Sequence, residues 1–96
     1  MTRLVNRVVS IYDRKTSMRL ALEEWTAFDD ICSREHLKRK KLLEMIEDNK
    51  KQNLGLTCYV RLFTIVYMHQ LAKMSALKMK AHEGNKDVYQ IFDMIA

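Results

Sequence analysis

Hydrophobic and polar positions alternate most clearly over residues 14–20, which read R-K-T-S-M-R-L. In an extended strand, side chains at alternate positions point to opposite faces. Lys15, Ser17 and Arg19 would therefore share a polar, basic face, and the opposite face would be mostly apolar. An ordinary surface strand would show the same alternation. The pattern predicts a half-buried strand with a positively charged, solvent-facing side. Whether this side binds a ligand has to be judged from the rest of the sequence.

Residues 3–12, R-L-V-N-R-V-V-S-I-Y, are rich in β-branched residues but alternate imperfectly. They predict an extended arm or an extra strand. A single strand cannot satisfy its ladder hydrogen bonds alone. Either residues 3–12 fold back as a hairpin, or a second copy of the chain pairs with residues 14–20. The link Asp13-Arg14 offers no glycine or asparagine for a tight primed turn, which favours antiparallel pairing across a homodimer.

Apolar positions at three- and four-residue spacing predict the helical part of the chain. The helices are expected over residues 22–35, 38–52 and 56–81, with a short amphipathic one in 82–96. The third helix is apolar on most faces in its first half, so it needs cover that a second subunit would supply. The chain is thus predicted to be mainly α. The expected domain organisation is an arm or extra strand at 1–13, a main domain at 14–81 and a tail at 82–96.

Four cations open the helix predicted over residues 38–52: Lys38, Arg39, Lys40 and Lys41. Positive charges at a helix N-terminus oppose the helix dipole and repel one another. A solvated charged surface is the ordinary alternative. An anion bound at the helix N-terminus would relieve both conflicts, so we favour an anion site at this position.

Composition narrows the class of protein. The chain has 96 residues and a formal net charge of +5, which is compatible with a polyanionic partner. A single core of this size is marginal, and oligomerisation is the usual remedy. Cys32 and Cys58 form no C-x-x-C motif, which favours a reducing, cytoplasmic setting. Neither a signal peptide nor an apolar run long enough to span a membrane is expected.

Motifs that carry catalytic or metal chemistry are not evident. Cys32 and His36 lie four residues apart, but two ligands do not make a site. We find no phosphate-cradling glycine loop and no nucleophile elbow, so we expect no enzyme, no metal and no cofactor. Arg61, on an apolar helix, is expected to be structural and to pair with Glu44 or Glu47.

The stretch T-S-M-R-L-A-L-E-E-W-T-A-F at residues 16–28 resembles the opening of ribbon-helix-helix domains of the Arc/MetJ superfamily. It is most similar to a subgroup with a T-S-x-R-L strand and a tryptophan five residues after the leucine. The subgroup's order continues in L-L-E-M-I-E at 42–47, in Asn53-Leu54 and in an apolar helix with Arg61-Leu62-Phe63. The resemblance covers about residues 14–70. Its connecting loop departs from the family, which often has a glycine and a Ser, Thr or Asn cap, where this chain has His36 and Lys38.

This resemblance implies a homodimer that binds double-stranded DNA, with paired strands in the major groove. By position, Lys15, Ser17 and Arg19 match the base-reading residues. Arg19 and Lys15 could reach guanine acceptors, and Ser17 would specify little. The basic start at residues 38–41 matches the family's phosphate clamp. The implied function is a transcriptional regulator, expected to be a repressor, which binds DNA as a dimer or as a dimer of dimers.

A different class of function uses the same scaffold. The chain could serve as a protein–protein interaction module, an inhibitor or adaptor that binds a partner through the third helix and the tail at 82–96. A pure interaction dimer needs neither cations on a solvent-facing strand nor four cations at a helix start. These two features favour DNA.

Overall fold

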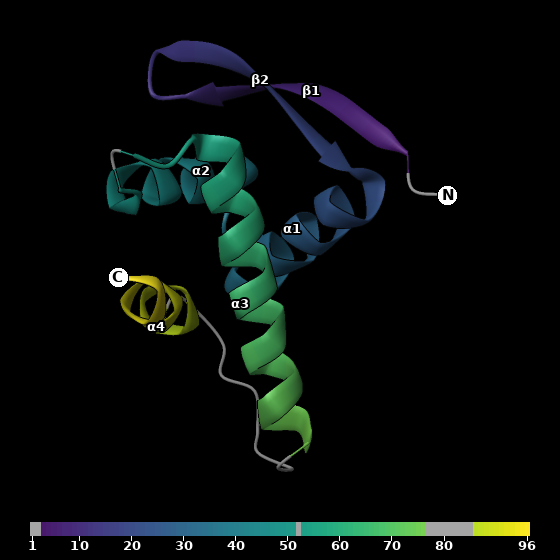
Figure 1. Cartoon of the computed structure of the whole chain (residues 1–96), viewed down its shortest axis with the longest axis vertical. Helices are drawn as coiled ribbons and strands as arrows, with labels where there is room; N and C mark the ends of the chain where they lie inside the picture. The colour runs from purple at the N-terminus through teal and green to yellow at the C-terminus, as the bar shows by residue number, and fades with distance from the viewer. Residues whose placement is uncertain (1–2, 52, 77–85) are drawn as a thin grey trace.

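In the part of the chain that the structure describes, a two-stranded antiparallel hairpin lies across one end of a group of four helices (Figure 1). The computed structural model describes residues 3–51, 53–76 and 86–96. The elements, in chain order, are β1 (Leu4–Ile11), β2 (Arg14–Ala21), α1 (Leu22–Glu35), α2 (Arg39–Asn49), α3 (Leu56–Ala76) and α4 (Lys86–Ile95). The mainly α class and the order of strand, helix and helix are as the sequence predicts.

The helix predictions differ from the structure mainly at their ends. The helix expected over 22–35 has those bounds. The one expected over 38–52 ends earlier, because Lys50 has an extended backbone and closes the helix with its N–H on the carbonyl of Ile46. The part of the third predicted helix beyond residue 76 lies outside the described residues, as does the start of the tail predicted over 82–96.

The hairpin forms within the chain. β1 pairs with β2 from Leu4 opposite Ala21 to Ile11 opposite Arg14. The imperfect alternation of β1 becomes regular in the structure, because Arg7 occupies an inward, half-buried position beside its apolar neighbours. An arginine can do so because it is paired with a carboxylate, as described below.

The turn at residues 12–13 is anchored on α2. Tyr12 has a left-handed backbone, with φ 53°, a conformation that glycine adopts more readily. Its N–H donates to Glu44 Oε2 at 2.8 Å, and its hydroxyl donates to Asp48 at 2.6 Å. The hydrogen bond to Asp48 is the main cause that raises the pKa of Tyr12 to about 12. Tertiary contacts thus hold a turn that the sequence makes unfavourable, and β2 has a partner inside its own chain.

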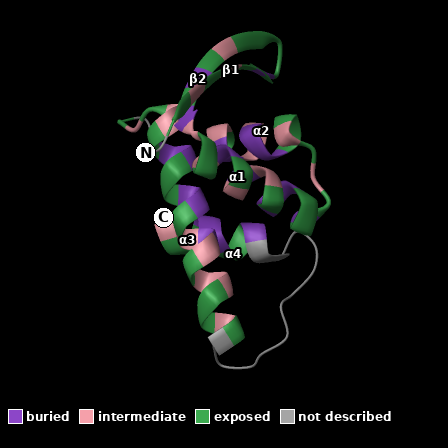
Figure 2. Ribbon diagram, turned by 90° about the vertical axis from the view of Figure 1, so that its right-hand side faces the viewer, coloured by how far each residue is buried: buried purple, intermediate pink, exposed green. Residues whose placement is uncertain are grey.

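Buried side chains from all six elements form one core beneath the hairpin (Figure 2). The hairpin contributes Ile11 and Leu20 from its inner face, and α1 contributes Trp25 and Phe28. Among the largest fully buried side chains on the other helices are Leu42, Leu43, Ile46, Tyr59, Phe63 and Ile91. The described helices include none that is long and apolar enough to cross a membrane.

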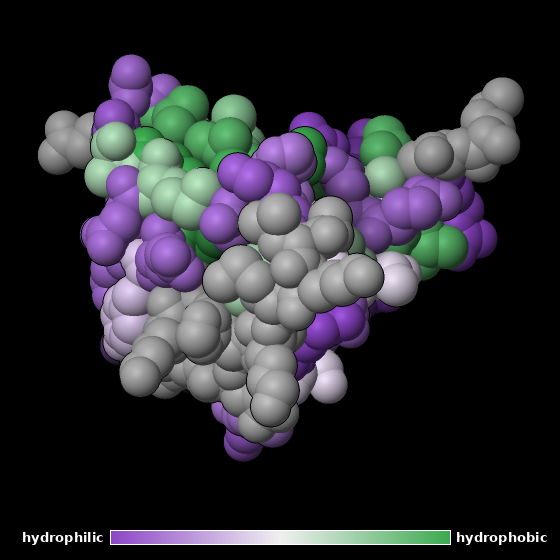
Figure 3. Space-filling view, turned by 90° about the horizontal axis from the view of Figure 1, so that it is seen from below, coloured by the Kyte–Doolittle hydropathy of each residue, from purple (hydrophilic) through white to green (hydrophobic). Residues whose placement is uncertain are grey.

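The tail helix α4 packs on α3. The rings of Phe63 and Phe92 are 5.1 Å apart between centroids, and Val88 and Ile91 are buried beside them. Hydrophobic surface is still exposed on the half of the molecule where α4 lies (Figure 3). On α4 itself, Tyr89 is 58% exposed and Met94 is 51% exposed.

Replacing Phe92 with alanine tests whether the tail belongs to the cooperative fold. We expect the free energy of unfolding to fall by about 3–5 kcal/mol, because removing a large buried side chain leaves a cavity. Urea denaturation followed by circular dichroism measures the change. Tyr89→Ala, on the exposed side of the same helix, should stay within about 0.5 kcal/mol of the parent. Equal losses for the two variants would contradict the docking of α4.

Candidate nucleic-acid interface

The outward face of β2 carries the three side chains that the sequence pattern predicts to face solvent. Lys15, Ser17 and Arg19 are exposed on one side of the strand, while Met18 and Leu20 on the other side are buried. The alternation predicted from the sequence is therefore present. This face points away from the helices, so it is accessible to a large ligand.

The second edge of β2 is open in the part of the chain that the structure describes, since the sheet there has two strands. The N–H of Leu22 donates to the carbonyl of Arg3 at 2.9 Å. Backbone groups alternate in direction along an antiparallel pair. The backbone groups of Leu22 point toward β1, and so do those of every second residue before it along β2. The N–H and C=O groups of the residues in between, Lys15, Ser17 and Arg19, point away from β1, toward the open edge.

Side chains close this edge near its C-terminal end. The N–H of Ala21 donates to Glu24 Oε1 at 2.7 Å, and Arg61 Nη2 lies 3.4 Å from the carbonyl oxygen of Arg19. Arg61 Nε is also 3.0 Å from Glu24 Oε2. The expected pairing of Arg61 with Glu44 or Glu47 is wrong. α3 brings Arg61 to the end of β2 and the start of α1, whereas both predicted partners lie on α2 and contact the hairpin turn.

The start of α2 presents unpaired amides and cations. Lys38 is the N-cap residue and makes no side-chain capping bond. The first helical hydrogen bond runs from the N–H of Leu42 to the carbonyl of Lys38, at 3.0 Å. The amides of residues 39–41 consequently have no acceptor within the helix. Such a terminus attracts anions.

The four cations at this start have different surroundings. Arg39 makes a close, multiple contact with Asp29, its Nη2 being 2.8 Å from one carboxylate oxygen and 2.9 Å from the other. Lys40 lies 3.9 Å from Glu44 on the same helix. Among the described residues, no ion pair involves Lys38 or Lys41, and both are exposed. These two lysines therefore carry most of the uncompensated charge.

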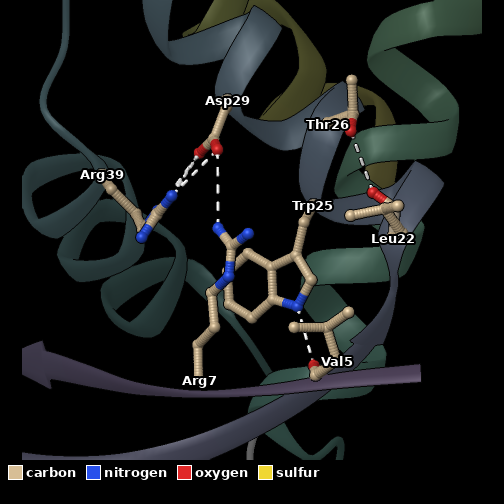
Figure 4. A network of polar contacts seen from close by, with 7 residues as sticks. All are labelled: Val5, Arg7, Leu22, Trp25, Thr26, Asp29 and Arg39. Carbon is tan, nitrogen blue, oxygen red and sulfur yellow. Dashed lines mark hydrogen bonds and ion pairs between the residues drawn. The ribbon is translucent and has the colours of Figure 1, made fainter. Parts of the chain in front are cut away.

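Asp29 is shared by two arginines around the indole of Trp25 (Figure 4). Arg7 Nη1, from β1, is 3.7 Å from Asp29 Oδ2. The guanidinium carbons of Arg7 and Arg39 lie 4.8 Å and 5.3 Å from the ring centroid. The indole Nε1–H donates to the carbonyl of Val5 at 2.9 Å. Trp25 thereby ties the middle of β1 to the start of α2.

The loop between α1 and α2 begins with an ordinary helix C-cap, although His36 stands where the family often has glycine. His36 closes α1 with a left-handed backbone, at φ 56° and ψ 41°, and its N–H meets the carbonyls of the last turn. This is the position that glycine usually takes. Cys32 lies buried on α1, where burial is the main cause that raises the pKa of its thiol to about 11. No group of three metal-ligating side chains occurs within the described ranges.

Sequence reasoning missed the outward residues of β1. Asn6, Val8 and Ser10 are exposed on the same side of the hairpin as the basic row of β2. They stand opposite Arg19, Ser17 and Lys15, respectively. Because Arg7 interrupts the apolar positions of β1, the sequence pattern did not separate its two faces. Only the register of the hairpin reveals that the surface is two strands wide.

Comparison with known families supports the same arrangement. The chain matches the model of a family described as the ribbon-helix-helix domain over residues 4–68. The match begins at the first residue of β1 and ends within α3, so it covers more than half of the chain. Comparison with curated proteins and with solved structures returns no significant match.

Asp29→Asn tests the shared carboxylate. We expect it to lower the free energy of unfolding by about 1 kcal/mol, because it leaves two guanidinium groups facing each other with no anion. The loss should shrink in 1 M salt, where exposed charges are screened. Urea denaturation at low and high salt provides the measurement. The matched control is Asp30→Asn, which removes an exposed contact with Arg34 and should cost no more than about 0.5 kcal/mol. An equal effect for both variants would show that the sharing has no energetic weight.

Proposed function

Because the chain belongs to the ribbon-helix-helix family, whose members are in general DNA-binding regulators, we propose that it is a sequence-specific transcriptional regulator. It acts as a homodimer and as a repressor, in the cytoplasm, without a cofactor. The observation that carries this proposal is the outward row of Lys15, Ser17 and Arg19 beside an open strand edge.

The homodimer forms when the open edges of two β2 strands pair. Backbone groups of Lys15, Ser17 and Arg19 point to that edge, and the hydrogen bond from Ala21 to Glu24 closes its C-terminal end. The middle of the available stretch is Ser17. An antiparallel pair about a two-fold axis would therefore place Ser17 opposite its own copy, and Lys15 opposite Arg19 of the second copy.

Apolar surface beside this edge supports a second copy. The contact of Arg61 with Arg19 brings the outward side of α3 next to β2. On that side Leu62 is 38% exposed and Ile65 is 66% exposed, although they lie on a helix whose other faces are buried. Leu22, at the adjoining start of α1, is 39% exposed. The copy that pairs with the edge would cover these side chains and complete the burial that α3 needs.

The charges explain why such a dimer is suited to DNA. Like charges directly opposite each other on adjacent strands are destabilising. In the symmetric pair of β2 strands, Lys15 of each copy would lie opposite Arg19 of the other. The acceptors of guanine bases in the major groove, with the surrounding negative potential, would relieve this repulsion. A two-stranded ribbon fits the major groove. Arg19 would bind guanine O6 and N7, with Lys15 beside it, and each good contact discriminates by about 1–3 kcal/mol.

The start of α2 would hold the phosphates beside the groove. The free amides of residues 39–41, together with Lys38, Lys40 and Lys41, supply hydrogen bonds and charge. The guanidinium of Arg39 holds Asp29, so Arg39 would contribute chiefly its amide. Contacts of this kind position the protein without reading sequence.

The second candidate is an interaction module, or a regulator that also binds a protein through its tail. It is favoured by Tyr89 and Met94, which are 58% and 51% exposed on α4. Assembly as a dimer of dimers on DNA is a further proposal. Selection of bound duplexes separates the two functions, because a pure interaction module enriches no DNA motif.

Arg19→Ala tests the reading face. Selection from random duplex DNA should enrich a motif for the parent protein, and the variant should lose the preference at one base pair in each half-site, a discrimination of about 1–3 kcal/mol. The matched control is Lys41→Ala at the start of α2. It should weaken binding to all sequences alike and lower the slope of log affinity against log salt by about one for each phosphate that the variant no longer neutralises. Retention of the parent motif by Arg19→Ala would refute the assignment.

Ser17→Cys tests the two-fold axis, in a Cys58→Ser background that removes the exposed native thiol. Hydrogen-bonded antiparallel neighbours have Cα atoms about 5.5 Å apart, within the range of a disulfide. Mild oxidation should therefore yield a covalent dimer on non-reducing gels. Ser10→Cys is the control, since it is exposed on β1, away from the proposed axis. Equal crosslinking of both variants would contradict a pairing centred on Ser17.

A further inference from the structure

The outward face of β1 continues the proposed DNA-binding surface. Its residues Leu4, Asn6, Val8 and Ser10 are all exposed, and Val8 is 68% exposed. They lie opposite residues of β2 in register, with Asn6 next to Arg19 and Ser10 next to Lys15. None of these four side chains belongs to the hydrophobic core of the described residues.

β1 is the strand of the hairpin that is tied to the start of α2. One edge of β1 pairs with β2. Its inner face carries Arg7, whose guanidinium lies on the ring of Trp25 as does that of Arg39, the first residue of α2, and the indole donates to the carbonyl of Val5 (Figure 4). The outward face of β1, beside the base-reading strand, would therefore lie close to the sugar-phosphate backbone that the start of α2 contacts.

The width of the proposed sheet also places β1 beside the sugar-phosphate backbone. If two β2 strands pair, the sheet has four strands, with β1 and its copy outermost. Strands are about 4.8 Å apart, so the outer strands would be about 14 Å apart. The major groove is about 12 Å wide and admits two strands. The central pair would enter the groove while each β1 faces one of its walls.

We propose that β1 is a second phosphate-contacting element, in which the Asn6 amide and the Ser10 hydroxyl donate hydrogen bonds to phosphate oxygens of double-stranded DNA. This inference rests on the proposed function. Neutral donors displace no counterions, so they would add affinity without adding salt dependence. In this they differ from Lys38 and Lys41 at the start of α2.

Adding charge to β1 is the sharpest test. In Asn6→Lys and in Ser10→Lys, each dimer would gain two phosphate neutralisations. The slope of log affinity against log salt should steepen by about two, and affinity at low salt should rise. The matched control is Met94→Lys, at a residue of α4 that is 51% exposed. α4 lies away from the hairpin (Figure 1), so the salt slope of this variant should equal that of the parent. The assay is titration of a fluorescent duplex at several salt concentrations.

Removing the donors gives the complementary result. Each of Asn6→Ala and Ser10→Ala removes two hydrogen bonds per dimer, so each should weaken binding about fivefold to a hundredfold, equally for all duplexes. The slope and the selected motif should stay unchanged.

Two outcomes would overturn the inference while leaving the proposed function intact. In the first, the β1 lysine variants have the same salt slope as Met94→Lys, although Arg19→Ala still loses the motif. In the second, Asn6→Ala changes the selected motif, which would make β1 a base-reading strand. A parent protein that shows no salt-dependent binding to duplex DNA would overturn the proposed function and the inference together.

Discussion

The indole of Trp25 is where the hairpin, α1 and α2 meet. Its Nε1–H binds the backbone of β1 at Val5, and its ring lies under the guanidinium groups of Arg7 and Arg39, which share Asp29. Cation–π contacts of this kind are worth about 0.5–2 kcal/mol each. Their larger consequence is geometric, because they set the position of the start of α2 relative to the strands. Any surface that uses both parts depends on this junction.

The junction also divides the charges of the chain into two groups. Arg7 and Arg39 face inward on a carboxylate and serve the fold, whereas Lys38 and Lys41 face solvent with no ion pair among the described residues. The row on β2 is likewise exposed. These positions therefore carry positive charge that the fold itself does not neutralise. A basic composition by itself would not have distinguished these two groups.

The hairpin shows how far sequence reasoning reaches and where it stops. The alternation of residues 14–20 predicted which side of β2 faces solvent, because a strand with one apolar side has a single way to bury it. The partner of β2 was harder to predict. A turn without glycine argued against a hairpin, but Glu44 and Asp48 of α2, more than 30 residues away in the chain, hold Tyr12 in its left-handed conformation. No local pattern contains that information.

By itself, the sequence determined the element types, the helix over residues 22–35, the solvent-facing side of Lys15, Ser17 and Arg19, and the basic start of α2. These follow from periodicity and from charge, which are local properties. Only the tertiary structure decided that Arg39 forms an ion pair with Asp29, that Arg61 pairs with Glu24, and that Asn6 lies opposite Arg19 in the hairpin. Each of these contacts joins segments that are distant in the sequence, and the packing of the core determines which segments meet.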